Sequence, residues 1–248
     1  MAAVASATRV VSVIGALLMS SRNLCIVAVL AALACNTGWA VPFSDNFDDG
    51  DLAGWQIKQG DWYSTGHSLM SSYDNYGVIW VADSFGLHQR IDVDAYFDGA
   101  AQTKTAQLRL RSGDSGSGSN PFFEHGYFAG VQGNTAYIYN AIGPNELHLL
   151  GPTSPLGLSA GWHQLGFSVD GLGNQTHLQL WVDGSLKLDV FDTQGSQHDD
   201  GGYVGLGASN HLNRQIEYDN VQVVPEPSTL VLLLVGGVGL LRLGARRK

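Results

Sequence analysis

The sequence predicts an all-β fold, an antiparallel β-sandwich that forms one domain between two targeting segments. Apolar and polar residues alternate strictly over 106–111, and the same period of two appears over 178–182, which is typical of strands with one buried and one solvent-facing side. Asp183-Gly184 follows the second segment, and this pair favours a two-residue type I′ hairpin turn. No stretch between the targeting segments has the periodicity of an amphipathic helix.

The first 40 residues predict a secretory signal peptide. An apolar run covers 24–34, Arg22 precedes it, and a short segment of small residues favours cleavage by signal peptidase after Ala40. Met19 is an alternative start that would leave a leader of ordinary length. A lipoprotein cleaved before Cys35 is a second interpretation, although the leucine usual three positions earlier is missing.

The composition of the segment after the leader limits its partners and its chemistry. Residues 41–224 hold 7 Lys and Arg against 21 Asp and Glu, a net charge of −14, which argues against nucleic acid and anionic membranes as partners. Cys25 and Cys35 both lie in the leader, so the segment has no disulfide, thiol nucleophile or thiolate metal site. We therefore expect its stability to come from its hydrophobic core.

The same alternation predicts strand after strand along this segment, at 87–97, 165–169 and 186–190 among others. Turn-forming residues recur about every ten residues. They are Gly60-Asp61, Asp98-Gly99, Gly133-Asn134, Gly143-Pro144, 171–174 and Gly201-Gly202. We expect about a dozen strands in one domain over 41–223, without an internal repeat.

Several segments together resemble the concanavalin A-like or laminin-G-like jelly roll. They are Asp45-Asn46-Phe47-Asp48-Asp49-Gly50 with Trp55, Gly161-Trp162-His163-Gln164-Leu165, Leu180-Trp181-Val182-Asp183-Gly184, Gly202-Tyr203-Val204-Gly205-Leu206-Gly207, and Ile216-Glu217-Tyr218-Asp219-Asn220-Val221. The resemblance spans nearly all of 41–223. It implies that the first and last strands lie next to each other.

This adjacency would bring the acidic opening loop, which includes Asp45, Asp49 and Asp51, close to the closing strand. Asp48, Asp219 and Asn220 are the best candidates for a structural calcium site, since carboxylate, amide and main-chain oxygens around one point suit this ion. Its role would be to hold the two ends of the sandwich together. The alternative is that these residues only build turns and cap loops.

Outward-pointing aromatic residues indicate a possible binding face. If Ala136 and Ile138 face the core, Tyr137 and Tyr139 face outward, and the same parity places Trp181 on the solvent side of its strand. Arg109 and Arg111 also point outward, with Gln107. Flat rings beside such polar groups suit a sugar ring. The alternative is that loops such as 112–122 cover these positions and make them a secondary core, whereas Trp55, Trp62, Trp80 and Trp162 are expected to pack.

The sequence offers no catalytic motif. Enzymes with this fold that cleave glycans typically carry Glu-x-Asp-x-x-Glu on one strand, because a retaining mechanism needs two carboxyl groups about 5 Å apart. Glu124, Glu146 and Glu217 are the glutamates of 41–224, and none lies in that pattern. We therefore expect no enzymatic activity.

Residues 224–248 resemble the PEP-CTERM sorting signal of Gram-negative bacteria. Pro225-Glu226-Pro227 is followed by an apolar segment at 229–243 and by a basic tail ending in Arg246-Arg247-Lys248. The apolar segment is short compared with the roughly 20 residues that span a bilayer, and the basic end is expected on the cytoplasmic side. The resemblance implies export, transient anchoring in the inner membrane and removal of the tail by an exosortase. An ordinary C-terminal membrane anchor is the alternative.

Three functions remain open on these grounds. The first is a non-catalytic protein of the cell surface or extracellular matrix, such as a biofilm matrix, that binds exopolysaccharide or another glycan. The second is a glycan-active hydrolase whose acids meet only in three dimensions. The third is a purely structural matrix protein.

Overall fold

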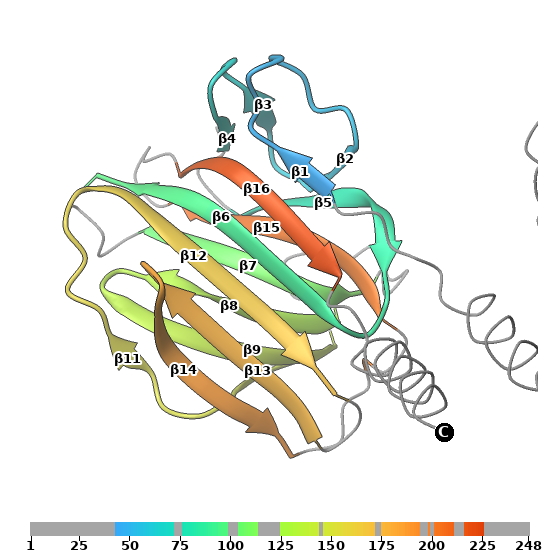
Figure 1. Ribbon diagram of the computed structural model, residues 1–248, viewed down its shortest axis with the longest axis vertical. Coiled ribbons are helices and arrows are strands. Elements are labelled where there is room, and N and C mark those ends of the chain that lie inside the picture. Colours follow the sequence, from blue (N-terminus) through green and yellow to red (C-terminus); the bar gives the residue numbers. More distant parts are fainter. Residues whose placement is uncertain are drawn as a thin grey trace, which may run out of the picture. The chain divides into compact units, whose positions relative to one another are not determined.

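The computed structural model describes residues 43–71, 76–98, 104–113, 125–143, 146–171, 175–193, 198, 201–210 and 216–225 of the 248-residue chain. These residues form two antiparallel sheets packed face to face, so the predicted all-β sandwich is confirmed (Figure 1). The predicted signal peptide and the apolar segment of the tail lie outside the described residues. Within the described part of the chain there is no helix long and apolar enough to cross a membrane.

Sheet A lies in front in Figure 1 and has eight strands. Its order is β14 (Ser185–Asp192), β13 (Thr176–Val182), β12 (Gly161–Asp170), β6 (Gln89–Phe97), β16 (Glu217–Pro225), β4 (Leu69–Ser71) and β3 (Trp62–Ser64), with β1 (Phe43–Asp45) paired to β16.

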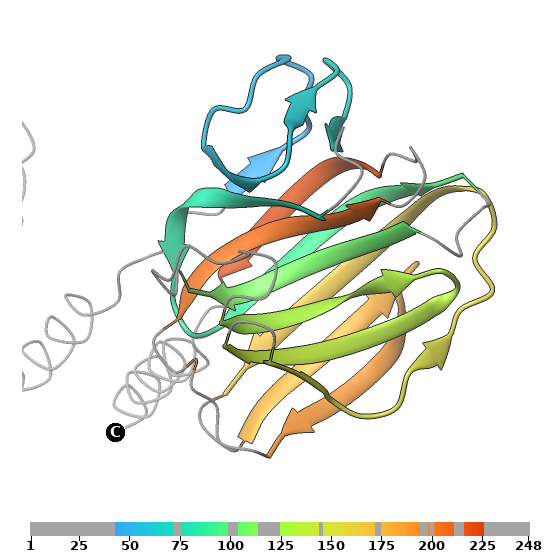
Figure 2. The ribbon, with the colours of Figure 1, turned by 180° about the vertical axis from the view of Figure 1, so that it is seen from behind.

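Sheet B also has eight strands and lies in front in Figure 2. Its order is β10 (Glu146–Leu149), β9 (Thr135–Gly143), β8 (Gly126–Gln132), β7 (Lys104–Ser112), β15 (Gly202–Asn210), β5 (Tyr76–Phe85) and β2 (Trp55–Gln59), with β11 (Ser154–Pro155) paired to β9.

Alternating side chains of both sheets form the core. In β6, buried and half-buried residues alternate without exception, and Ile91 and Val93 reach the interior. From the opposite sheet, Leu108 and Ile138 join the same cluster. The hairpin between β13 and β14 turns at Asp183 and Gly184, whose φ angles of 51° and 70° are the left-handed values that a type I′ turn needs.

The two ends of the domain meet as expected. β1 pairs with β16 in the register Phe43↔Val223 and Asp45↔Val221. β16 ends at Pro225, the first residue of the Pro-Glu-Pro triplet, and a proline cannot donate to a further ladder hydrogen bond. The opening loop and the closing strand are therefore neighbours, while Glu226 and Pro227 lie outside the described residues.

Polar groups also link the two sheets through the interior. The hydroxyl of Tyr218 from sheet A accepts from the backbone N–H of Gln107 and donates to the carbonyl of Gly207, at 3.0 and 2.6 Å. At another point Asp192 accepts hydrogen bonds from the Tyr127 hydroxyl and the Asn140 amide, at 3.0 and 2.7 Å. Both groups are buried, and their hydrogen bonds fix how one sheet sits on the other.

Candidate functional site

The predicted glycan-binding residues fall on opposite faces of the sandwich. Tyr137, Tyr139 and Arg109 lie on β9 and β7 of sheet B, whereas Trp181 lies on β13 of sheet A. Arg111 lies near the end of β7. The predicted parity is correct, since Ala136 and Ile138 are in the core, but the five residues do not form one face.

The prediction that Tyr137 and Arg109 meet solvent is wrong. Tyr137 is 5% exposed and Arg109 is fully buried, while Tyr139 is half-buried. The guanidinium of Arg109 lies over the ring of Phe128, 4.1 Å from its centre. Burial also raises the pKa of the Tyr137 phenol well above its ordinary value. These side chains therefore form an inner layer.

The glycines of β15 explain part of this burial. Gly205 and Gly207 occupy the outward positions of the strand, between Trp80 on β5 and Arg109 and Gln107 on β7. A Cβ atom at Gly205 would lie 2.5 Å from Cδ1 of Trp80, and one at Gly207 would lie 2.8 Å from Oε1 of Gln107. Side chains from the neighbouring strands therefore lie flat over β15.

A small second core stands on this face of sheet B. Trp80 and Val78 are fully buried, and the ring of Tyr203 stacks on Trp80 with centroids 4.9 Å apart. The ammonium of Lys58 lies 4.6 Å from the centre of the Trp80 ring. This cluster differs from the secondary core that the sequence left open, which consisted of Tyr137, Tyr139 and Trp181 under loops such as 112–122. Tyr137 is buried as that alternative expects, while 114–122 lies outside the described residues. Gly205 and Gly207, two residues apart, were the signal in the sequence for side chains that lie over β15.

Arg111 is a structural residue, which corrects its assignment to the binding face. Its φ of 49° breaks the alternation of β7, and its side chain is 1% exposed. The guanidinium donates to the main-chain carbonyls of Leu87, Gly171 and His198. Its backbone N–H donates to the Gln89 amide oxygen at 2.7 Å. Arg111 thereby ties together segments distant in the sequence.

The outer face of sheet A has a different character. Trp181 is half-buried there, and the guanidinium of Arg90 lies 4.6 Å from the centre of its ring. Arg90 also donates two hydrogen bonds to Asp92, at 2.8 and 2.9 Å. Gly166 pairs with both Trp181 and Asp92, and a Cβ atom there would lie 2.6 Å from Oδ1 of Asp92. The glycine makes room for this polar group beside the indole ring.

Phe191 and His177 form an aromatic pair near the edge of this face. Their rings stack with centroids 4.4 Å apart and an interplanar angle of 9°, and Phe191 is 58% exposed. Nε2 of His177 lies 2.5 Å from Oδ1 of Asp189, and this hydrogen bond holds the pKa of the Asp189 carboxyl below its ordinary value. The histidine is thus oriented by the carboxylate while the phenylalanine ring faces solvent.

Trp162 and Tyr96 form a second exposed aromatic pair on β12 and β6. Their rings meet edge to face at 5.5 Å, and Trp162 is 46% exposed. The expectation that Trp162 packs in the core is therefore wrong, whereas Trp55, Trp62 and Trp80 are buried as expected. The parity of β12 places Trp162 outward, since it lies an odd number of positions from the core residue Leu165.

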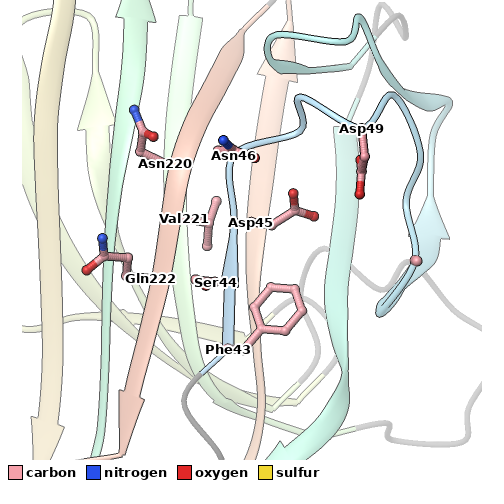
Figure 3. A pocket seen from close by; sticks show the side chains of 9 residues that line it. Phe43, Ser44, Asp45, Asn46, Asp49, Asn220, Val221 and Gln222 are labelled. Carbon is pink, nitrogen blue, oxygen red and sulfur yellow. The ribbon is translucent and has the colours of Figure 1, made fainter.

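The predicted calcium ligands lie at the β1–β16 end of the same sheet. An open hollow of about 480 Å³ is lined there by residues that include Asp45, Asn46, Asp49 and Asn220 (Figure 3). The oxygens of Asp45 are already engaged, because they accept from the Phe47 backbone N–H and from Nε1 of Trp55 at 2.8 and 2.7 Å. In Figure 3, Asp45 and Asp49 lie to one side of β1 and Asn220 to the other.

Asp219 marks where negative charge accumulates at this end. Its pKa is raised by partial burial and by the nearby carboxylates of Asp94, Asp48 and Asp45, against a backbone hydrogen bond from Asn220 that lowers it. The Asn220 amide nitrogen donates to Asp94 at 2.9 Å and to Asp219 at 3.2 Å. Among the described residues, no three His, Cys, Asp or Glu side chains come together as a metal site. Calcium at Asp48, Asp219 and Asn220 stays a prediction.

Comparison with protein families identifies the C-terminal segment of the chain as a sorting signal. Residues 223–248 match the family described as the PEP-CTERM protein-sorting motif. The chain carries a PEP-CTERM sorting signal. This signal indicates export and processing by an exosortase during transit through the membrane. A search of the curated proteins finds no match to this chain.

Comparison with solved structures supports the fold of the domain that precedes the PEP-CTERM signal. A carbohydrate-binding module, CBM66 from Bacillus subtilis, is 16% identical over 69% of this chain and 95% of its own, with a TM-score of 0.51. A protein of unknown function with a galectin-like fold from Bacillus subtilis is 13% identical over 74% and 94%, with a TM-score of 0.59. An endo-1,3-β-glucanase from Streptomyces sioyaensis is 17% identical over 75% and 96%, with a TM-score of 0.55.

These neighbours are jelly-roll domains of the concanavalin A-like and galectin-like kind, so the predicted architecture of the PEP-CTERM protein is confirmed at the level of fold. At such identities the likeness concerns the fold alone. Binding modules and an enzyme share it, so function must be argued from the site.

Proposed function

We propose that this exported protein is a non-catalytic glycan-binding protein of the cell surface or extracellular matrix, and that it binds through the outer face of sheet A. The observation that carries the proposal is the exposure of aromatic rings beside charged groups on the outer face of this sheet. Phe191 is 58% and Trp162 is 46% exposed, and Trp181 lies between them beside Arg90 and Asp92. Rings give stacking surface for sugar C–H groups, and the charged groups supply hydrogen bonds.

The fold and the sorting signal support this proposal from two directions. A carbohydrate-binding module and the carbohydrate recognition domain of Emp46p are among the proteins with a similar fold. The PEP-CTERM signal indicates export, which would bring the domain into contact with extracellular polysaccharide. Signal peptidase and an exosortase would then be its processing partners.

Binding without cleavage is favoured by the sequence. The Glu-x-Asp-x-x-Glu pattern of glycan-cleaving enzymes is missing from 41–224. Glu217 lies on β16, and the acid next to it in the sequence is Asp219. The similar fold of an endo-1,3-β-glucanase keeps a hydrolase as the second candidate. A hydrolase would release reducing ends, which distinguishes it from a binding protein.

A glycan array probed with the full-length protein tests the proposal. We expect wild-type protein to bind at least one glycan, and Trp181→Ala and Trp162→Ala each to weaken binding by about tenfold, since aromatic contacts of this kind contribute about 1 kcal/mol or more. Release of reducing ends from the bound glycan would favour the hydrolase instead.

Tyr137→Phe is the matched control, because it alters an aromatic residue on the outer face of sheet B and preserves its packing. This variant is expected to bind as wild type does. If the Trp variants bind normally and Tyr137→Phe does not, the binding face has been assigned to the wrong sheet. If no glycan binds, the structural matrix role remains.

A further inference from the structure

The exposed aromatic residues of sheet A follow a regular spacing. On β13, His177 and Trp181 are four residues apart, and on β12, Gly166 and Trp162 are four residues apart. Trp181 pairs with Gly166, and because the strands are antiparallel, Trp162 continues the line from His177 through Trp181. The three aromatic positions thus form one oblique row.

The row can be measured by strand geometry. Four residues of a β-strand rise about 13 Å, so the row from the His177–Phe191 pair through Trp181 to the Trp162–Tyr96 pair extends over about 26 Å. Figure 1 shows the strands β14, β13, β12 and β6 side by side along this path. One sugar ring covers one aromatic pair, so only several consecutive units can reach all three.

Polar side chains occupy the positions between the aromatic ones. Arg90, Gln179 and Asp189 lie on β6, β13 and β14 between the first two aromatic positions, at the level of the buried Ser168 of β12. Asp94 and Gln164 pair between the second and the third. Stacking surfaces therefore alternate with rows of hydrogen-bonding groups, as the C–H faces and hydroxyl groups of a sugar chain require.

The charge of this face selects among sugar chains. Arg90 and Lys187 are opposed by Asp92, Asp94, Asp189, Glu217 and Asp219 on the same sheet. Arg90 is already paired with Asp92, so negative charge is in excess. A polysaccharide that carries carboxylate or sulfate groups would be repelled, whereas an uncharged chain or one with amino groups would not.

We infer that the outer face of sheet A is an extended track for a polysaccharide without acidic groups, which lies along the strands and stacks on His177–Phe191, Trp181 and Trp162–Tyr96 in turn. The inference rests on the proposed function and adds the class and the extended form of the ligand. Because each contact holds the next sugar units close to the following aromatic position, affinity should grow with chain length.

Calorimetry on the full-length protein with uncharged β-linked glucose oligosaccharides, from disaccharide to hexasaccharide, tests the inference. We expect the dissociation constant to fall at least about tenfold from the shortest to the longest. Phe191→Ala and Trp162→Ala, at the two ends of the track, should each remove most of this gain and so raise the dissociation constant of the hexasaccharide by about tenfold. Tyr63→Ala, which removes a 40% exposed aromatic residue of β3, is the control and should retain the gain.

Several results would overturn the inference. Equal affinity for all lengths, with both end variants like wild type, would reduce the track to a single subsite while leaving the proposed function intact. A polyuronate that binds as tightly as the uncharged chain would refute the selection by charge. A dimer that the end variants convert to monomer, with glycan binding unaffected, would assign the exposed rings to a protein interface. Failure to bind any glycan would refute the proposed function and the track together.

Discussion

The two outer faces of the sandwich contain similar residues and use them differently. Each has aromatic rings beside an arginine, with Arg109 over Phe128 on sheet B and Arg90 over Trp181 on sheet A. On sheet B the arginine is fully buried, whereas the Arg90 side chain is 35% exposed and salt-bridged to Asp92. In both cases an arginine lies over an aromatic ring, and both arginines point to the outside of their sheet. The difference in burial is what separates a second core on sheet B from a surface on sheet A that can bind a ligand.

The difference indicates where mutations should affect stability and where they should affect binding. On sheet B, replacing a buried ring with alanine leaves a cavity, because the surrounding side chains are packed and relax only partly to fill it. On sheet A the same replacement exposes a little more of a surface that is already wet. Stability measurements on paired variants therefore test the comparison most directly.

Trp80→Ala and Trp162→Ala should show the largest difference in the free energy of unfolding. Trp80 is fully buried under the stacked ring of Tyr203, so its removal is expected to lower the free energy of unfolding by about 3–5 kcal/mol. Trp162, 46% exposed, should contribute about 1 kcal/mol or less. Urea unfolding of both variants measures the difference, and Trp80→Phe serves as a conservative control. Equal losses would mean that the two faces are not distinct in packing.

The second prediction compares a titratable group inside the sandwich with one on its surface. Burial, together with the neighbouring His125, lowers the pKa of His198 to about 4, and Nε2 of His198 lies 2.9 Å from the Asn140 amide oxygen. Between about pH 6.5 and 4 the unfolded chain binds a proton that the folded protein does not, so stability should fall as pH falls, by up to about 3 kcal/mol.

His198→Gln should flatten the free energy of unfolding over this pH range, as followed by urea titration at successive pH values. His67→Gln is the control, since His67 is 90% exposed and its replacement should change stability by less than about 0.5 kcal/mol. A wild-type curve that stays level between pH 6.5 and 4 would contradict the assignment of His198 as a buried, neutral histidine.

The fold was predictable because strands with one buried side leave a period of two in the sequence. Alternation located most long strands, Asp183-Gly184 located a hairpin, and the resemblance to jelly rolls placed β1 beside β16. The short strands β3, β4, β10 and β11 were missed, since two to four residues are too few to display a period.

The candidate site was less predictable, because parity indicates which sheet side a residue faces and not whether that side is covered. Tyr137 and Trp181 satisfy the same pattern, yet one is 5% exposed and the other half-buried on a different sheet. Sheet membership depends on pairings between distant strands, such as β12 with β6, which no local pattern encodes. Trp162 was missed for another reason, since the parity of its own strand places it outward and it was nevertheless expected to pack in the core.

The smallest expected effect lies at the acidic end of the exposed face. Partial burial and the carboxylates of Asp94, Asp48 and Asp45 raise the pKa of Asp219. Ionisation of Asp219 therefore costs stability, and the loss appears as pH rises through its folded pKa. Asp219→Asn should therefore raise stability at neutral pH by less than about 0.5 kcal/mol, because the group is only half-buried and solvent screens the neighbouring charges.

If calcium binds at Asp48, Asp219 and Asn220, the wild-type melting temperature rises with calcium and falls with chelator, and Asp219→Asn loses both responses. Asp61→Asn, on the loop between β2 and β3, is the control. A wild-type melting temperature that does not respond to calcium would leave the acidic residues as loop caps and the exposed face without a metal.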